Sequence, residues 1–180
     1  MKRNLLLILI IFPSCLNLIF PKEIRGETYR FYYDKAIEKS DKGLHLEAIN
    51  FFNKAIELKP NLWPAINNRG LDKFLMGDFQ GAISDFSKTL EIKPSYANAF
   101  YYRGWAKDLN QDYKGAIKDL NSAIEIDEDI ADYYFVLGNS YFKSGDLKSA
   151  CSSWNKATNS SGMIYENIVD DAKTMLKVCN

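Results

Sequence analysis

The sequence predicts an all-α solenoid of four helix pairs followed by a C-terminal capping helix, and three observations lead to this fold class. Similar segments recur every 34 residues. Small and bulky residues return at the same places in each copy. Within a copy, two stretches with apolar residues at helical spacing flank a turn signal. One helix pair cannot cover its own apolar side, so stacked copies are needed to bury a continuous core.

The repeat is clearest in the second helix of each pair, which reads AINFFNKAIELKP from residue 48, AISDFSKTLEIKP from 82 and AIKDLNSAIEIDE from 116. Five columns of matching size can be aligned. They are Ala48, Ala82, Ala116 and Ala150; Phe52, Phe86, Leu120 and Trp154; Ala55, Thr89, Ala123 and Ala157; Pro60 and Pro94; and Ala36, Gly70, Gly104 and Gly138.

The elements follow in order along the chain. Residues 29–62 form a degenerate first copy, in which Ala36 replaces the column glycine. Residues 63–96 form the second, with a turn at Gly77-Asp78 and a boundary at Pro94, which cannot continue a helix. The third and fourth copies occupy 97–130 and 131–164, and residues 165–180 keep the register of a first helix with no second helix after it. We therefore expect 165–180 to be a cap.

The column glycines have a structural explanation. Glycine inside a helix costs about 1 kcal/mol relative to alanine. Three such residues at one position make sense where two helices must approach closely. Gly70, Gly104 and Gly138 are therefore expected to face the second helix of their own pair.

These residues resemble the tetratricopeptide repeat family. The resemblance is strongest in NRGLDKFLMGDFQGAISDFSKTLEIKP and YRGWAKDLNQDYKGAIKDLNSAIEI, good in VLGNSYFKSGDLKSACSSWNKA and weaker in 29–62. It covers residues 29–164 and implies a right-handed α-solenoid whose first helices line a concave groove. Relatives that hold acidic chaperone tails use a basic clamp that this chain lacks at the matching positions, so that function is not carried over.

Residues 1–26 have the layout of an export signal, with two cations, an apolar run from Leu5 to Phe12 and then Pro13. Cleavage after Gly26 or near Ser14, a retained membrane anchor through residues 5–20, and lipidation of Cys15 all remain open. We expect the protein to be exported to a periplasm, a lumen or the exterior, or to be anchored facing that compartment.

Cys151 and Cys179 are expected to form a disulfide. Neighbouring helices of the array run roughly antiparallel, so the end of the cap should lie beside the start of the helix before it. An oxidising compartment would allow the bond, which would stabilise the fold by about 3–4 kcal/mol in the chain-entropy description. The alternative is a pair of buried free thiols.

Composition and motifs argue against several function classes. The net charge is +0, and falls to −3 if residues 1–26 are removed, which gives no support to nucleic-acid binding. The single histidine, His45, has no partners at metal-ligand spacing, and no phosphate loop or catalytic triad is evident. Arg69 with Asp85 and Arg103 with Asp119 repeat at one spacing and are expected to be structural ion pairs. We therefore expect no enzyme activity, cofactor, metal, nucleic acid or small-molecule substrate.

The first helices would place aromatic and amide side chains in the groove. Aromatic rings supply large contact areas at low entropic cost, and amides can bind the backbone of an extended peptide. Some of these rings would instead fill gaps between helices. The predicted groove residues are Tyr33, Asn67, Asn68, Phe74, Tyr101, Tyr102, Trp105, Phe135, Asn139 and Phe142.

The sequence thus predicts a non-enzymatic interaction module, an exported scaffold or adaptor that binds a partner peptide or segment in its groove. The alternative is a self-associating structural component of a membrane or envelope complex.

Overall fold

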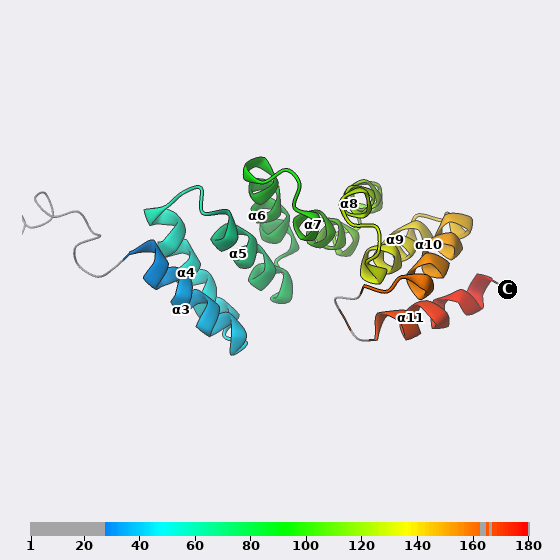
Figure 1. The fold of residues 1–180 in the computed structure, drawn as a ribbon, viewed down its shortest axis with the longest axis horizontal. Coiled ribbons are helices and arrows are strands. Elements are labelled where there is room, and N and C mark those ends of the chain that lie inside the picture. The colour runs from blue at the N-terminus through cyan, green and yellow to red at the C-terminus, as the bar shows by residue number, and fades with distance from the viewer. Residues whose placement is uncertain (1–27, 163–164, 166, 180) are drawn as a thin grey trace, which may run out of the picture. The chain divides into compact units, whose positions relative to one another are not determined.

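The computed structural model describes residues 28–162, 165 and 167–179, and these residues form helices joined by short turns (Figure 1). The predicted export signal and Cys15 lie outside the described residues. The helices are α3 (Tyr29–Asp41), α4 (His45–Leu58), α5 (Trp63–Leu75), α6 (Phe79–Ile92), α7 (Ala97–Leu109), α8 (Tyr113–Ile126), α9 (Ala131–Lys143), α10 (Leu147–Asn159), α11 (Ile168–Met175) and the 3-10 helix η3 (Leu176–Cys179). The described chain divides into two compact units, with the boundary inside α5 between Ala65 and Ile66. The predicted all-α solenoid of helix pairs is confirmed.

The turns inside the helix pairs are built by one recurring pair of positions. Gly43, Gly77 and Gly145 adopt φ values of 71°, 82° and 91°, which glycine reaches without strain. The next position is an aspartate in three copies, where it caps the second helix. Its carboxylate accepts a hydrogen bond from the backbone N–H three residues later, as Asp78 does from Gly81 at 2.9 Å. The first copy has Leu44 there, without a side-chain cap.

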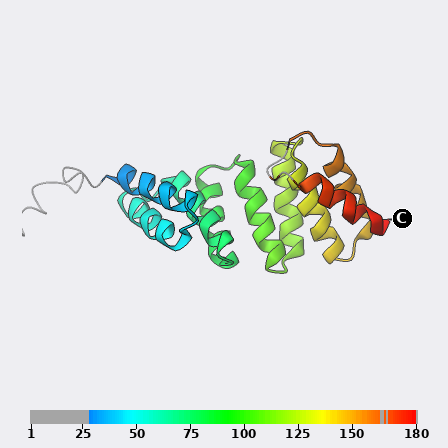
Figure 2. The same cartoon turned by 90° about the horizontal axis from the view of Figure 1, so that it is seen from below.

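The repeated columns form the core of each unit. Ala36, the alanine column, the Phe52 column and the Ala55 column are all fully buried, including the large rings of Phe86 and Trp154. In the first unit, α3 and α4 enclose a cluster around Phe52. In the second, clusters around Phe86, Leu120 and Trp154 follow one another along α6 to α11, whose neighbouring rods are visible in Figure 2. Burial thus follows the 34-residue period.

The column glycines of the second unit lie against the second helix of their own pair. A Cβ atom would meet Phe86 Cε1 at 3.1 Å from Gly70, Leu120 Cγ at 3.0 Å from Gly104, and Trp154 Cδ1 at 2.4 Å from Gly138. The missing side chain is therefore what allows the helices to approach, as the sequence predicts.

The last helix covers the end of the second unit. α11 packs on α10 and α9 and buries Ile168 and Ala172 (Figure 1). The helix begins three residues later than the predicted start of the cap, and its final turn tightens into η3. Cys151, early in α10, and Cys179, in η3, are joined by a disulfide with Cα atoms 5.9 Å apart. The cap is thus tied to the helix that it covers.

Candidate functional site

Four of the predicted groove residues meet in one aromatic cluster in the second unit, contributed by α5 and α7. Ring centroids of Phe74 and Trp105 are 4.9 Å apart, those of Phe74 and Tyr102 are 6.0 Å apart, and those of Tyr101 and Trp105 are 5.7 Å apart. Tyr102 also stacks on Phe86, at 5.9 Å, from beneath. Tilted and edge-on contacts at these distances are the favoured geometries for aromatic rings, so the cluster holds its outer rings in fixed positions.

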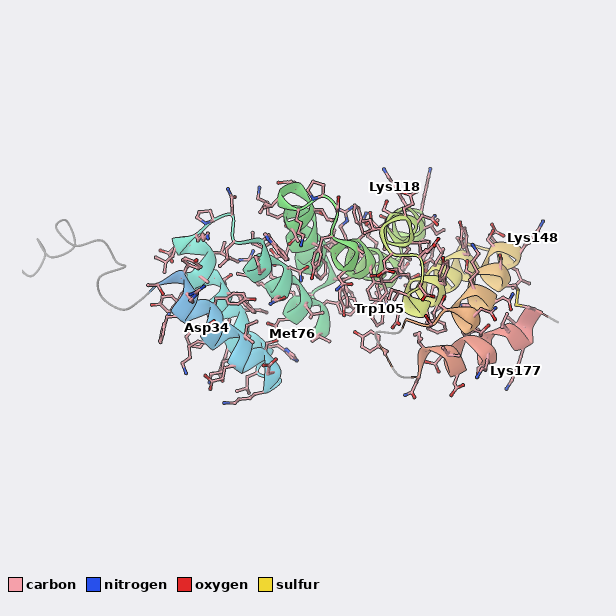
Figure 3. All side chains as sticks on the ribbon, viewed as in Figure 1. Asp34, Met76, Trp105, Lys118, Lys148 and Lys177 are labelled. Atoms are coloured by element: carbon pink, nitrogen blue, oxygen red, sulfur yellow. A yellow bond between two sulfur atoms is a disulfide. The ribbon has the colours of Figure 1, made fainter. Side chains whose placement is uncertain are left out.

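Only part of this cluster offers surface to a partner. Tyr101 is fully buried and Phe74 is 7% exposed, because both rings fill the space between adjacent helices. These two rings therefore cannot contact a partner as predicted, and instead pack beneath the exposed rings. Tyr102 and Trp105 are half-buried and present their outer edges. We call these two side chains the aromatic face; in Figure 3, Trp105 lies on the lower side of α7, the side on which α11 also lies.

A side chain absent from the predicted set lies against this face. The Tyr165 ring is edge-on to Trp105 at 5.8 Å, and its hydroxyl is 3.5 Å from the hydroxyl of Tyr102. Its backbone N–H donates to Asp132 Oδ1 at 3.1 Å. Asp132 lies in the first turn of α9 and is fully buried. Neither Tyr165 nor Asp132 lies in one of the five aligned columns, so those columns gave no signal for them.

The hydroxyl groups around the face lie in a poorly hydrated environment. Burial raises the pKa of Tyr102 well above its ordinary value, and the hydrogen bond with Tyr165 raises it further. Burial and then the nearby Asp132 carboxylate likewise raise the pKa of Tyr101. Within the described part of the chain, no group hydrogen-bonds the Tyr101 hydroxyl. These phenols therefore stay neutral and serve as hydrogen-bonding groups, not as bases.

The other predicted groove residues fall in three places. Phe135, Asn139 and Phe142 all lie on α9, where Asn139 accepts the indole N–H of Trp154 at 3.0 Å and Phe142 lies 5.7 Å from that ring. Phe142 is 45% exposed. Asn139 and Phe142 thus contact their own helix pair, whereas Phe135 packs against both the Leu120 and the Trp154 clusters.

The amides Asn67 and Asn68 lie together on α5, where the Asn67 amide donates to Asn68 Oδ1 at 3.3 Å. Asn67 is 6% exposed, so Asn68 provides most of the accessible surface. Tyr33 belongs to the first unit and lines a hollow of about 320 Å³. The residues around this hollow are Tyr29, Arg30, Tyr33, Asp34, Leu62 and Pro64.

The repeated Arg–Asp pairs are structural, as the spacing predicts. Arg69 binds Asp85 through two nitrogens, at 2.9 and 2.5 Å, and Lys73 binds the same carboxylate at 2.8 Å. Arg103 and Lys107 repeat this arrangement on Asp119 at 2.7–2.8 Å. Both aspartates are buried, and buried carboxylates need such partners. The guanidinium groups are therefore committed to the fold.

Among the described residues, no group of three His, Cys, Asp or Glu side chains lies close enough to hold a metal ion. No helix in the same part of the chain is long and apolar enough to cross a bilayer.

Comparison with known proteins agrees with the repeat geometry. Residues 29–62 and 131–162 match the family described as "Tetratricopeptide repeat", and residues 109–145 match "TPR repeat". No curated protein matches this sequence.

Solved structures share the fold. The structure titled "MamA 41-end from Desulfovibrio magneticus RS-1" aligns with a TM-score of 0.72 at 23% identity, covering 83% of this chain and 90% of that one. A second, "Crystal structure of MamA protein", gives 0.72 at 26% identity and covers 84% and 90%. "Crystal structure of APC/C hetero-tetramer Cut9-Hcn1" gives 0.72 at 19% identity, covering 84% of this chain and 30% of that chain.

Three independent features agree: the 34-residue columns are buried, the column glycines are in helix–helix contact, and family matches fall on the repeats themselves. This chain belongs to the tetratricopeptide repeat family.

Proposed function

We propose that this protein is an exported, non-enzymatic scaffold or adaptor that holds a segment of a partner protein on its aromatic face. The observation that carries the proposal is the pair Tyr102 and Trp105, half-buried side by side on α7 and supported from below by Phe74 and Phe86. Rings that are already fixed lose little conformational freedom when they bind, and Trp and Tyr often dominate binding energy at interfaces.

The repeat architecture supports a role in binding. A solenoid presents a broad surface of side chains from successive helices. The charged residues that could serve chemistry, such as Asp85 and Asp119, are instead neutralised in buried ion pairs. Tetratricopeptide repeats are protein-interaction modules, so a protein partner fits this chain best.

Export rests on two separate features. Residues 1–26 carry the basic and apolar pattern of a secretory signal. Cys151 and Cys179 are joined by a disulfide, and such a bond persists in oxidising compartments. A periplasm, a lumen or the exterior meets this condition, as does a membrane-anchored form facing one of them.

The proposal can be tested by crosslinking and affinity capture from the native envelope and membrane fraction. Trp105→Ala should remove the specific partner or weaken its recovery at least tenfold, because the outer ring of the face is lost. Ile126→Ala is the matched control, since Ile126 is an exposed apolar residue on α8. Recovery that is unchanged by Trp105→Ala, with the variant folded, would overturn the proposed surface.

A self-associating structural role is the competing function. Several large apolar side chains, including Leu46, Leu75, Met76 and Val178, are at least half exposed and could join copies. Sedimentation velocity over a hundredfold concentration range separates the two roles. An adaptor without its partner should keep one sedimentation coefficient, whereas a self-assembling component should shift to larger species.

A further inference from the structure

The aromatic face is already occupied by a residue of the same chain. Tyr165 reaches it from the connection between α10 and α11 and contacts two different first helices, through Trp105 and Tyr102 on α7 and through Asp132 on α9. Its side chain remains 38% exposed. The tyrosine is therefore seated on the surface and not built into a hydrophobic core.

Gly162, three residues before Tyr165, is bound through its backbone to the connection that precedes α9. Gly162 forms a parallel bridge with Ile130, in which the Ala131 N–H donates to the Gly162 carbonyl at 2.7 Å and the Gly162 N–H donates to the Asp129 carbonyl at 2.8 Å. A Cβ on Gly162 would lie 2.7 Å from that same Asp129 oxygen. Gly162 is thus held through its backbone at close range, which is also how extended peptide ligands are bound.

A second anchor fixes the segment without touching the aromatic face. The Asp129 carboxylate accepts the Ser161 N–H at 3.0 Å and also the Ser161 hydroxyl. The bond from the Ser161 hydroxyl lowers the pKa of Asp129 most, and the bond from the Ser161 N–H lowers it further. Asp129 is exposed, so this anchor can be removed without opening the core.

Together these contacts describe a recognition site for a short motif. The site offers a buried carboxylate for a backbone N–H, an indole for a T-shaped ring contact, and a phenol for a hydroxyl. We infer that the aromatic face recognises an extended segment that presents a tyrosine, and that Tyr165 occupies this place until a partner displaces it. This inference rests on the proposed function and adds the chemistry of the partner.

The energetic consequence is a reduced apparent affinity for the partner. A partner can bind only the fraction of molecules in which the face is free, so its dissociation constant rises by the inverse of that fraction. A short connection keeps Tyr165 at a local concentration of about 1 mM or more. If Tyr165 occupies the face about nine-tenths of the time, freeing the face strengthens partner binding about tenfold.

The test uses the full, oxidised chain and a labelled peptide, SGMIYEN, which copies residues 161–167. Fluorescence anisotropy should show about tenfold tighter binding to Tyr165→Ala than to the wild type. Asp129→Ala should strengthen binding in the same direction, because it loosens the segment and leaves the face intact. The peptide with tyrosine replaced by alanine should bind at least tenfold more weakly.

Trp105→Ala in the Tyr165→Ala background should abolish peptide binding, and Tyr113→Ala, at the start of α8, is the control in that background. Circular dichroism melting confirms that each variant is folded. Equal binding of the peptide to wild type and Tyr165→Ala would overturn occupation by Tyr165. No binding of the tyrosine peptide to Tyr165→Ala would overturn the whole inference, while Trp105-dependent capture of a native partner would still uphold the proposed function. Capture that does not depend on Trp105 would instead remove the proposed function itself.

Discussion

Single residues decide how closely the paired helices approach. At Gly138 the helix–helix contact is tightest, because the face of the Trp154 indole lies where a Cβ would stand. The indole cannot easily withdraw, since it is fully buried and its N–H is bonded to Asn139. At Gly70 the nearest atoms are farther away, at 3.1 Å. The same residue type therefore carries different constraints in different copies.

Gly138→Ala should destabilise the protein by about 2 kcal/mol, because overpacking in a closed core commonly costs about 1–3 kcal/mol. Urea denaturation followed by circular dichroism measures the loss. Gly70→Ala is the matched comparison, and its steric strain should be largely offset by the better helix propensity of alanine, about 1 kcal/mol. Equal stability of Gly138→Ala and wild type would mean that the Trp154 contact is looser than described.

The turn between α7 and α8 contains a residue in an unfavourable backbone conformation. Gln111 has φ 66°, whereas the same place in the other three copies is glycine. A non-glycine residue in this region costs about 1 kcal/mol. Gln111→Gly should therefore raise the free energy of unfolding by up to about 1 kcal/mol, visible as a higher melting temperature. Gly77→Ala should lower it by a similar amount, and a loss of stability in Gln111→Gly would contradict the assignment.

Elements differ in how well their ends are secured. Three second helices begin with an aspartate that caps their N-terminal amides, whereas α4 begins after Leu44 and lacks this cap. At the opposite end of the chain, α11 is held by two buried side chains and by the bond between Cys151 and Cys179. Each difference makes a separate prediction about the stability of one element.

Leu44→Asp should stabilise the first helix pair by about 1 kcal/mol, because it would supply the missing N-cap. It also removes an exposed leucine. Hydrogen exchange of the first-turn amides of α4 measures the effect directly, and Leu44→Ala controls for the lost apolar surface. Equal exchange in the aspartate and alanine variants would show that the carboxylate does not reach those amides.

Replacing Cys151 and Cys179 together with serine should loosen α11 first and lower stability by about 3 kcal/mol in the chain-entropy description. The closed segment spans 28 residues. Reduction of the wild type with dithiothreitol should produce the same fast exchange in α11. Mass spectrometry of the native protein without reduction provides the direct check, and two free thiols there would contradict the disulfide.

At the scale of the whole molecule, stability depends on phenols that are kept neutral. Burial raises the pKa of Tyr133 to about 12 and raises those of Tyr101 and Tyr102 still more. In the unfolded chain all three tyrosine hydroxyls would ionise at about pH 10. The folded state therefore holds more protons above that pH, so its stability is intact below about pH 10 and decreases as the pH rises further.

The unfolding free energy should thus be lower at about pH 11 than at about pH 9. Tyrosinate absorbance should appear together with loss of helical circular dichroism, because ionisation of these groups requires unfolding. Tyr133→Phe should flatten this pH dependence, although it also removes the bond from the Tyr133 hydroxyl to Asn98. Ionisation of all eleven tyrosines in a chain that keeps its helices would contradict the expectation.

Much of the fold could be predicted because the residues that determine each helix pair lie within one repeat. The alanine and glycine columns, the turn at Gly77-Asp78 and the pair Arg69–Asp85 all lie within one 34-residue unit, and recurrence distinguishes them from chance. The site was harder to predict. Tyr101 and Tyr102 are adjacent on α7, and the period cannot tell which ring faces a neighbouring helix and which faces outward.

Tyr165 was beyond the reach of the pattern for a different reason. Its register position matches Tyr29, Trp63, Ala97 and Ala131, which begin α3, α5, α7 and α9. Tyr165 instead lies ahead of α11, so the register does not place its ring. Its contacts with Trp105 and Asp132 span 60 and 33 residues along the chain, and such long-range approaches emerge only when the helices are assembled.

The unequal ends of the array have a consequence for how the chain is degraded. Each repeat is stabilised mainly by contacts with its nearest neighbours, so local unfolding starts at the repeat that is least stabilised. In the first pair, α4 begins without a side-chain cap. At the other end, a disulfide ties η3 to α10. A protease should accordingly cleave this protein first in its amino-terminal repeat and leave a resistant carboxy-terminal fragment that still carries Tyr102 and Trp105.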